Sequence, residues 1–261
     1  MNGAVFVAKE FSHVPSNLLF AGGCQLTGGH MSRIKALMFD KDGTLFDFYA
    51  TWGVWARTVL LELAAGDAAV ASRLGAAIGY DFAAGQFASG SVVIAGTPRE
   101  IAAQLVPMLG GITVDALVAE MNQKAATAPQ AEAVPLLPFL QDLKTRDLKL
   151  GVATNDSEVP AKAHLAKSGV LEIFDFVAGS DSGFGGKPAA GQLLGFCQSV
   201  GVEAQNCAMV GDSLHDLHAG AAAGFYRIAV LTGVATHSDL APYADVVLDS
   251  IGDIPAHLDM L

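Results

Sequence analysis

Short apolar runs that alternate with helical segments constrain the fold of this chain most strongly. The runs cover residues 34–39, 148–153, 176–178, 208–210 and 228–231, with 246–248 as a candidate sixth. Each has the length of a strand, and its continuous apolar character is typical of strands buried on both faces of a parallel sheet. The segments between them have helical patterns that end before Gly169, Gly201 and Gly224, where a helix commonly stops. The sequence therefore predicts an α/β fold with a doubly wound parallel sheet.

The stretch 48–135 interrupts this alternation soon after the first strand. It contains helical patterns and no clear strand, so we expect an all-helical cap domain inserted into the sheet domain. The core is then formed by residues 33–47 and 136–261. Residues 1–32 are interpreted as an N-terminal extension outside the core, and we assign no role to it.

Composition narrows the class of protein. The net charge of −11 disfavours binding to nucleic acid or to an anionic membrane surface, because the 15 Lys and Arg form no basic cluster. No apolar run reaches the length of about 18 residues that a membrane span needs. The three cysteines lack disulfide or zinc spacing and are typical of free thiols. With no recognisable signal peptide, these features predict a cytoplasmic protein.

Polar residues stand at the ends of the expected strands. Asp40 follows the first run, Thr154-Asn155-Asp156 the second and Asp212 the fourth, while Lys187 precedes Pro188 in the loop after the third. The carboxyl ends of parallel strands meet at one edge of a sheet, and ligands bind in the crevice there. We therefore expect these side chains to converge on one site.

These motifs resemble those of the haloacid dehalogenase superfamily, in its phosphoglycolate-phosphatase-like branch with a helical cap. The resemblance rests on Asp40-Lys41-Asp42-Gly43-Thr44, on Thr154, on Lys187-Pro188 and on Gly211-Asp212-Ser213-Leu214-His215-Asp216, in that order. It covers residues 34–250 and implies a Rossmann-like core. It also implies a phosphatase that hydrolyses a small phosphate monoester, phosphoglycolate-like or sugar-phosphate-like.

The resemblance assigns the catalytic roles. The carboxylate of Asp40 would attack phosphorus and form an aspartyl-phosphate, which divides hydrolysis into two easier steps. Asp42 would protonate the leaving alcohol and later deprotonate the attacking water. Lys187 would neutralise the charge of the reacting phosphoryl group. Thr154 would bind phosphoryl oxygens, and we place Thr44, Asn155 and Lys187 in the same phosphate site.

A magnesium ion is the implied cofactor. Its ligands would be the carboxylates of Asp40 and Asp212 and the backbone carbonyl of Asp42, because Mg²⁺ prefers oxygen ligands and keeps several waters. Asp216 is carried over as an outer acidic residue that holds Lys187 or a metal-bound water. The implied partner is a small phosphorylated metabolite, and we expect a monomer or a weak homodimer.

Alternatives remain open at this point. A sugar-phosphate mutase commonly has Val where Thr44 stands, a phosphonatase needs a cap lysine that Lys124 does not convincingly supply, and a dehalogenase lacks the carboxylate of Asp42. A non-catalytic phosphometabolite-binding protein is the alternative from another class. We expect Lys41 to point away from both aspartates, as alternation along an extended strand end predicts.

The cap offers few clear signals. The candidates for substrate contacts are Trp52, Trp55, Arg57, Tyr80 and Arg99. Either arginine could bind a second anionic group of the substrate. His215 and His218 have a spacing that a zinc site could use, but without further ligands nearby we interpret them, like His164, as packing or surface residues.

Overall fold

The computed structural model describes residues 34–261, so the predicted extension 1–32 lies outside the described residues. In this part of the chain, one sheet has six parallel strands in the order β5-β4-β1-β6-β7-β8. The strands are β1 (Ala36–Phe39), β4 (Lys149–Ala153), β5 (Phe176–Ala178), β6 (Cys207–Gly211), β7 (Tyr226–Val230) and β8 (Val246–Leu248). The prediction of a parallel α/β sheet is confirmed.

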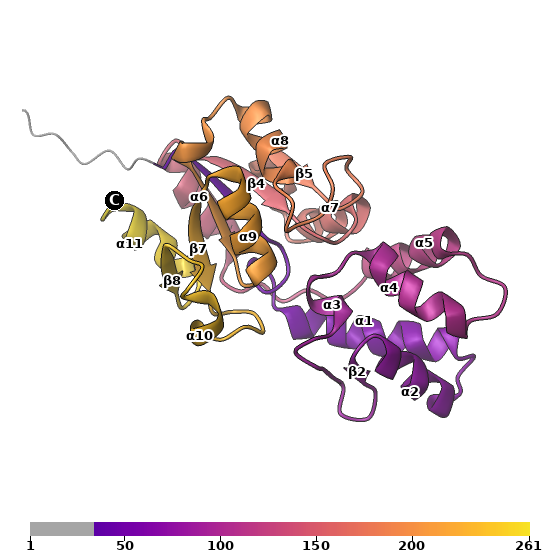
Figure 1. Cartoon of the computed structure of the whole chain (residues 1–261). Coiled ribbons are helices and arrows are strands. Elements are labelled where there is room, and N and C mark those ends of the chain that lie inside the picture. Colours follow the sequence, from indigo (N-terminus) through magenta and orange to yellow (C-terminus); the bar gives the residue numbers. More distant parts are fainter. Residues whose placement is uncertain (1–33) are drawn as a thin grey trace, which may run out of the picture. The chain divides into compact units, whose positions relative to one another are not determined.

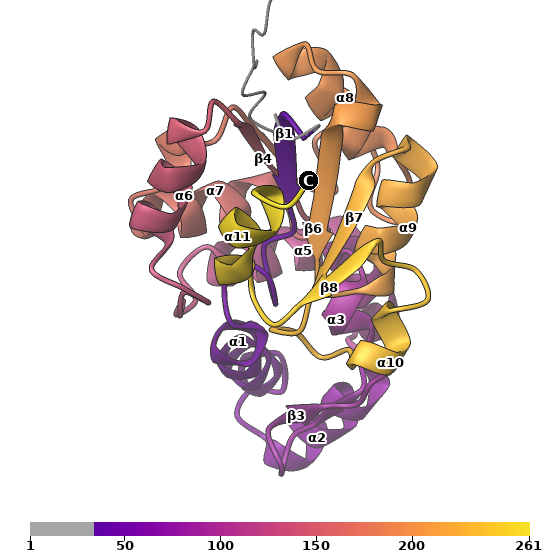
Figure 2. The ribbon, with the colours of Figure 1, turned by 90° about the vertical axis from the view of Figure 1, so that its left-hand side faces the viewer.

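Helices cover both faces of this sheet, as Figure 2 shows. They are α6 (Leu136–Thr145), α7 (Glu158–Lys167), α8 (Gly191–Val200), α9 (Leu214–Ala223), α10 (His237–Leu240) and α11 (Ile254–Leu258). Leu37 and Phe39 of β1 belong to an apolar cluster with residues of α6, α7 and α11, whereas Ala36 and Met38 cluster with residues of α8 and α9. All four side chains are fully buried, which explains the continuous apolar run in the sequence.

The insertion has its own apolar core. Its elements, labelled in Figure 1, are α1 (Phe48–Leu63), α2 (Ala68–Ala77), β2 (Tyr80–Asp81), β3 (Gln86–Phe87), α3 (Val92–Ala95), α4 (Pro98–Leu105) and α5 (Val114–Ala125). Trp52, Trp55 and Leu117 are among its buried residues. The expectation of an all-helical cap is wrong in one detail, because β2 and β3 pair antiparallel. Strands of two residues are too short to show an alternating pattern.

The two segments that join cap and core run beside each other. Phe46 forms an antiparallel bridge with Glu132, and the amide of Asp47 donates to the carbonyl of Ala131 at 2.8 Å. The amide of Ala133 donates to the carbonyl of Leu45 at 2.9 Å. The cap therefore begins and ends at one paired point next to the end of β1.

Short 3₁₀ helices connect several of the described elements. They are η1 (Val106–Met108), η2 (Leu171–Ile173), η3 (Ala204–Asn206) and η4 (Ile251–Asp253). No helix in residues 34–261 combines the length and the apolar character needed to cross a membrane.

Candidate active site

The topology places the predicted motifs side by side. β1 lies between β4 and β6, so Asp40, Thr154 and Asp212 follow three neighbouring strands at the same edge of the sheet. The amide of Asp40 still donates to the carbonyl of Val210 at 2.8 Å, which fixes the backbone of Asp40 against β6. This edge is the crevice in which parallel sheets bind ligands.

Lys187 completes this group from the loop after β5. Its Nζ lies 2.6 Å from Oδ1 of Asp40 and 2.6 Å from Oδ1 of Asp216. Although burial opposes it, the charges of Asp216 and Asp40 raise the pKa of Lys187 above its ordinary value. The ammonium is therefore held in its charged form between two carboxylates, next to the residue expected to attack phosphorus.

The carboxylates at this edge share a buried, crowded environment. Burial raises the pKa of Asp40 to about 7, with Lys187 opposing the shift and Asp216 adding to it. Burial, together with the charges of Asp40 and Asp216, raises the pKa of Asp212 well above its ordinary value. Such a cluster of acidic groups carries more negative charge than one lysine balances, so a further cation would stabilise it.

The geometry of this cluster fits a magnesium ion. Carboxylate oxygens of Asp40, Asp212 and Asp216 all lie within 4.8 Å of one another. A Cβ atom at Gly43, which has φ +84°, would clash with the Asp212 carboxylate, so the turn leaves that space to Asp212. The hydroxyl of Thr44 donates to Oδ1 of Asp212 at 3.2 Å. The oxygen donors are of the kind that Mg²⁺ prefers.

Asn155 organises the backbone around Lys187. Its Oδ1 accepts from the amide of Lys187 at 2.7 Å, and its Nδ2 donates to the carbonyls of Lys187 at 2.8 Å and of Ala95 at 2.7 Å. Its side chain thus connects the lysine loop to the cap. Thr154 accepts at Oγ1 from the amide of Asp156 at 3.1 Å. Phosphate binding by these two residues stays a prediction.

The expected direction of Lys41 is wrong. Its Nζ lies 2.6 Å from Oδ2 of Asp42 and 3.4 Å from Oδ2 of Asp156, and the side chain is fully buried. β1 ends at Phe39 and the chain bends after it, so the alternation of an extended strand no longer applies. Sequence reasoning also missed His164, whose Nδ1 lies 3.0 Å from Nζ of Lys41. A lysine between two aspartates directly after a buried strand was the available signal.

The cap candidates divide into two groups. Trp52 and Trp55 line a cavity of about 50 Å³ that also contacts Asp40, Asp42 and Lys187. The other three do not line this cavity: Arg57 donates to the carbonyl of Phe82, Tyr80 donates to the carbonyl of Gly53, and Arg99 pairs with Asp115.

The two histidines of α9 do not share a site. His215 lines the cavity, whereas the ring of His218 packs edge-on against Tyr243 with centroids 5.1 Å apart. Their spacing in the sequence therefore does not produce a zinc centre in the described residues, and the acidic cluster at the strand ends is the candidate metal site.

Comparison with known proteins decides the family. A family model described as haloacid dehalogenase-like hydrolase matches residues 34–224. This chain belongs to the haloacid dehalogenase-like hydrolases. It is 38% identical over 128 residues to a phosphoglycolate phosphatase of Chromobacterium violaceum, which covers 48% of this chain and 57% of that protein. The chain spans about half the length of this and other curated relatives that it matches.

Solved structures of the superfamily share the fold. CbbY from Rhodobacter sphaeroides, solved in complex with phosphate, has a TM-score of 0.65 at 21% identity and covers 87% of this chain and 99% of its own. A β-phosphoglucomutase from Clostridium difficile has a TM-score of 0.59 at 17% identity, covering 87% and 97%. Because proteins with different names share this fold, the reaction has to be argued from the site residues.

Proposed function

We propose that this hydrolase is a Mg²⁺-dependent phosphatase that cleaves a small phosphate monoester through an aspartyl-phosphate on Asp40. The arrangement of Lys187 against Asp40, with Asp42 on the same cavity, is the observation that carries this proposal. The matched relatives named phosphoglycolate phosphatase support a phosphate monoester as the substrate class. We also propose a cytoplasmic location, which the free thiols of Cys197 and Cys207 support.

In the first step, a carboxylate oxygen of Asp40 attacks phosphorus and the bond from phosphorus to the ester oxygen breaks. Asp42 donates its proton to the departing oxygen, which leaves as the alcohol. Lys187 neutralises negative charge on Asp40 and on the phosphoryl oxygens, and so lowers the repulsion between nucleophile and substrate. The products of this step are the free alcohol and a phosphorylated Asp40.

In the second step, Asp42 takes a proton from water, the water oxygen bonds to phosphorus, and the bond to Asp40 breaks. This releases inorganic phosphate and restores both carboxyl groups to their starting states. Asp40, Asp212 and the backbone carbonyl of Asp42 would hold Mg²⁺, with Asp216 nearby. A bound Mg²⁺ supplies positive charge at the phosphoryl oxygens.

The alternatives receive less support from the site. A phosphonatase would need a lysine of the cap in the cavity, but Lys124, the cap lysine, forms an ion pair with Glu62 and does not line the cavity. A non-catalytic binding protein would have no use for the second carboxylate of Asp42 beside Asp40. A mutase is separated from a phosphatase by whether phosphate is passed to water or to a second sugar phosphate, which an assay decides.

Phosphate release from a panel of monoesters, with Mg²⁺ or with EDTA, tests the proposal. We expect Mg²⁺-dependent release that falls about a thousandfold or more in Asp40→Asn, because the amide is a very poor nucleophile. Full activity in EDTA, or unchanged activity in Asp40→Asn, would contradict it. Phosphate transfer to an added sugar phosphate, with little release to water, would favour the mutase instead.

A further inference from the structure

The cap side of the active-site cavity is mainly apolar, with Asn122 as its polar side chain, whose Nδ2 donates to Oγ of Ser157 at 2.9 Å. This side presents aromatic and aliphatic side chains, which include Trp52, Trp55, Val93, Ile94, Ile101 and Met121. The charged groups that line the cavity, Asp40, Asp42, Asp156 and Lys187, all come from the core. The phosphoryl group has its partners at this charged floor, so the leaving group of an ester bound there would face the apolar wall.

The cationic side chains of the cap lie outside the lining of the cavity. Residues 48–135, which the structure describes in full, contain Arg57, Arg73, Arg99 and Lys124, and none of them lines the cavity. The guanidinium of Arg57 lies 4.7 Å above the ring of Phe82. Arg73 is exposed, and the other two form the ion pairs already described. A second anionic group of a substrate would find no cap cation.

The start of α4, on the cap side of the cavity, is also occupied. Pro98, the first residue of α4, has no N–H, and the amide of Thr97 donates to Oε2 of Glu100 at 2.7 Å. The amide of Glu100 donates to Oγ1 of Thr97 at 3.3 Å. The carboxylate of Glu100 therefore takes the place that an anionic ligand would use at a helix N-terminus.

We infer that the substrate of this site is a phosphate monoester with a small, uncharged and mainly apolar leaving group, and not phosphoglycolate. This inference rests on the function proposed above. A glycolate carboxylate in the cavity would lie among apolar side chains and near the carboxylates of Asp42 and Asp156. An unpaired charge in such surroundings is strongly disfavoured, whereas an alkyl group is stabilised there.

Phosphate esters whose leaving groups have the same size distinguish the effect of leaving-group charge from that of leaving-group shape. Isobutyl phosphate, the phosphate ester of glycolamide and phosphoglycolate have leaving groups of almost equal volume that are apolar, polar and anionic. At about pH 8, we expect kcat/KM for isobutyl phosphate to exceed that for phosphoglycolate by about a hundredfold. Glycolamide phosphate should fall between them.

A substitution in the cap wall tests the same preference for an uncharged leaving group. Ile94→Lys, at a half-buried position on the cavity, should raise the ratio of phosphoglycolate to isobutyl phosphate hydrolysis at least tenfold. Met108→Lys, on the exposed surface of the cap, should leave the ratio unchanged. Phosphoglycolate hydrolysed as well as isobutyl phosphate, through Asp40, would overturn the inference alone. Failure to release phosphate from any ester, p-nitrophenyl phosphate included, would overturn the proposed function.

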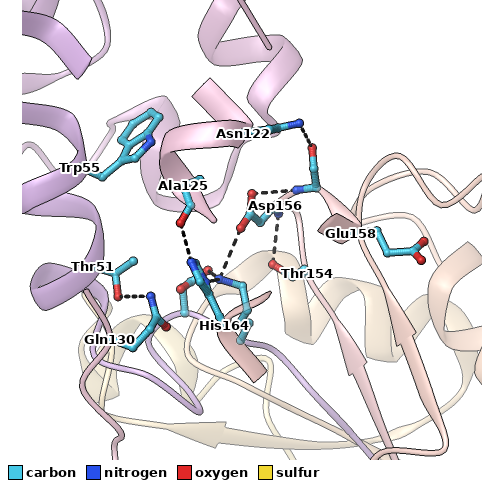
Figure 3. A network of polar contacts seen from close by, with 12 residues as sticks. Thr51, Trp55, Asn122, Ala125, Gln130, Thr154, Asp156, Glu158 and His164 are labelled. Carbon is cyan, nitrogen blue, oxygen red and sulfur yellow. Dashed lines mark hydrogen bonds and ion pairs between the residues drawn. The ribbon is translucent and has the colours of Figure 1, made fainter. Parts of the chain in front are cut away.

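A second inference concerns Lys41, to which the mechanism gives no role. Its fully buried ammonium forms a hydrogen bond with Nδ1 of His164 at 3.0 Å and ion pairs with Oδ2 of Asp42 at 2.6 Å and Oδ2 of Asp156 at 3.4 Å. Figure 3 shows this network, in which His164 also reaches Ala125. Trp52 of the cap lies beside it, with Nζ 5.4 Å from the ring centroid.

The hydrogen bonds define the tautomer of His164. Its Nε2 lies 2.6 Å from the carbonyl of Ala125, which can only accept, so Nε2 has the proton and Nδ1 accepts from Lys41. Burial lowers the pKa of His164 to about 4, which agrees with a neutral ring. Ala125 is the last residue of α5, so Lys41 is connected through His164 to the cap.

The geometry points to Lys41 as a positioning residue for Asp42, and to His164 as the residue that connects this position to the cap. Lys41 holds Oδ2 of Asp42, while Oδ1 is buried without a hydrogen-bond partner among residues 34–261. The Asp42 carboxylate lines the cavity, so this ion pair fixes the group that would transfer the proton. Without the lysine, the Asp42 carboxylate would keep its chemistry but lose its fixed orientation.

The dependence on the leaving group tests this role. Lys41→Met keeps the length of the side chain and removes its charge. We expect kcat/KM for isobutyl phosphate, whose alcohol must be protonated in the first step, to fall at least ten times more than kcat/KM for p-nitrophenyl phosphate, whose phenolate departs without a proton. An equal loss for both esters would mean general damage to the site and would overturn the proposal.

His164 provides variants that keep the lysine. His164→Asn can retain the acceptor at the place of Nδ1, whereas His164→Gln can retain only the donor to Ala125. The selective loss on isobutyl phosphate should be larger in His164→Gln than in His164→Asn. Equal behaviour of the two variants, or a loss that is not selective, would contradict the role of His164. These variants keep the proposal testable if Lys41→Met does not fold.

Discussion

The floor and the cap wall of the active-site cavity are built from opposite kinds of residue. The floor consists of core residues at the strand ends, among them Asp40 and Lys187, which form an ion pair, and the carboxylates of Asp212 and Asp216 lie next to Asp40. The wall consists of cap residues such as Trp55 and Met121, which also belong to the apolar cluster of the cap. The floor has the groups that are proposed to react, and the wall is mainly apolar, with Asn122 as its polar side chain.

This difference implies separate roles for the floor and the wall in rate and in choice of substrate. Changes at the floor alter the charge next to phosphorus, where the reaction needs it, and are expected to affect the rate strongly. Changes at the wall alter the fit of the leaving group and are expected to affect mainly the choice of substrate. The network of Lys41 and His164 connects the two, because it joins Asp42 to the end of α5.

The largest effect is expected at the floor. Lys187→Met removes the only cation that lies between Asp40 and Asp216 in the described structure, and should lower kcat/KM by about a thousandfold. Steady-state kinetics with p-nitrophenyl phosphate measures it. Lys162→Met, which removes an exposed lysine paired with Glu158, is the matched control and should have little effect. A loss below tenfold in Lys187→Met would remove the distinction between floor and wall.

An intermediate effect is expected for His164, which connects Lys41 and Asp42 to the cap. Because the pKa of His164 is about 4 in the folded protein and near 6.5 in the unfolded chain, unfolding takes up a proton between these pH values. The stabilising contribution of neutral His164 is complete above pH 6.5 and is lost as the pH falls toward 4, by up to about 3 kcal/mol. Denaturant unfolding of the wild type and of His164→Gln, from pH 7.5 to 4, measures this loss. A difference between the two that stays constant with pH would contradict a neutral, buried His164.

The smallest effect is expected at the wall. Met121→Ala enlarges the cavity and should raise the ratio of kcat/KM for phenyl phosphate to that for ethyl phosphate by about tenfold, with kcat for ethyl phosphate nearly unchanged. Leu74→Ala is the control, because Leu74 is buried in the same cap cluster but does not line the cavity. A shift of the ratio in the control as well would mean that cap stability, and not wall shape, sets the selectivity.

Much of the floor could be predicted from the sequence. Apolar runs identified the strands, and the parallel arrangement alone requires that Asp40, Thr154 and Asp212 meet at one edge. Lys187 was found because it belongs to a motif that resembles the superfamily. The cap was located by its helical pattern, although the short pairing of Tyr80–Asp81 with Gln86–Phe87 gave no periodic signal.

The side-chain contacts across long sequence separations could not be predicted. Lys41 and His164 are 123 residues apart, and nothing in the pattern around a single histidine on α7 indicates its partner. The direction of Lys41 depends on the bend after β1, which strand alternation does not describe. Arg57 and Arg99 were reasonable anion ligands by residue type, but their orientation is decided by packing in the cap and by Asp115.

The central claim is that Asp40 is phosphorylated during turnover, and mass spectrometry tests it most directly. In Asp42→Asn the second step lacks its base, while p-nitrophenyl phosphate does not need the acid in the first step, so the intermediate should accumulate. After acid quenching with Mg²⁺ present, we predict one phosphoryl group on the peptide that contains Asp40, and none when Asp40→Asn is added to the variant. A phosphoryl group on another residue, or one that persists with Asp40→Asn, would contradict the account.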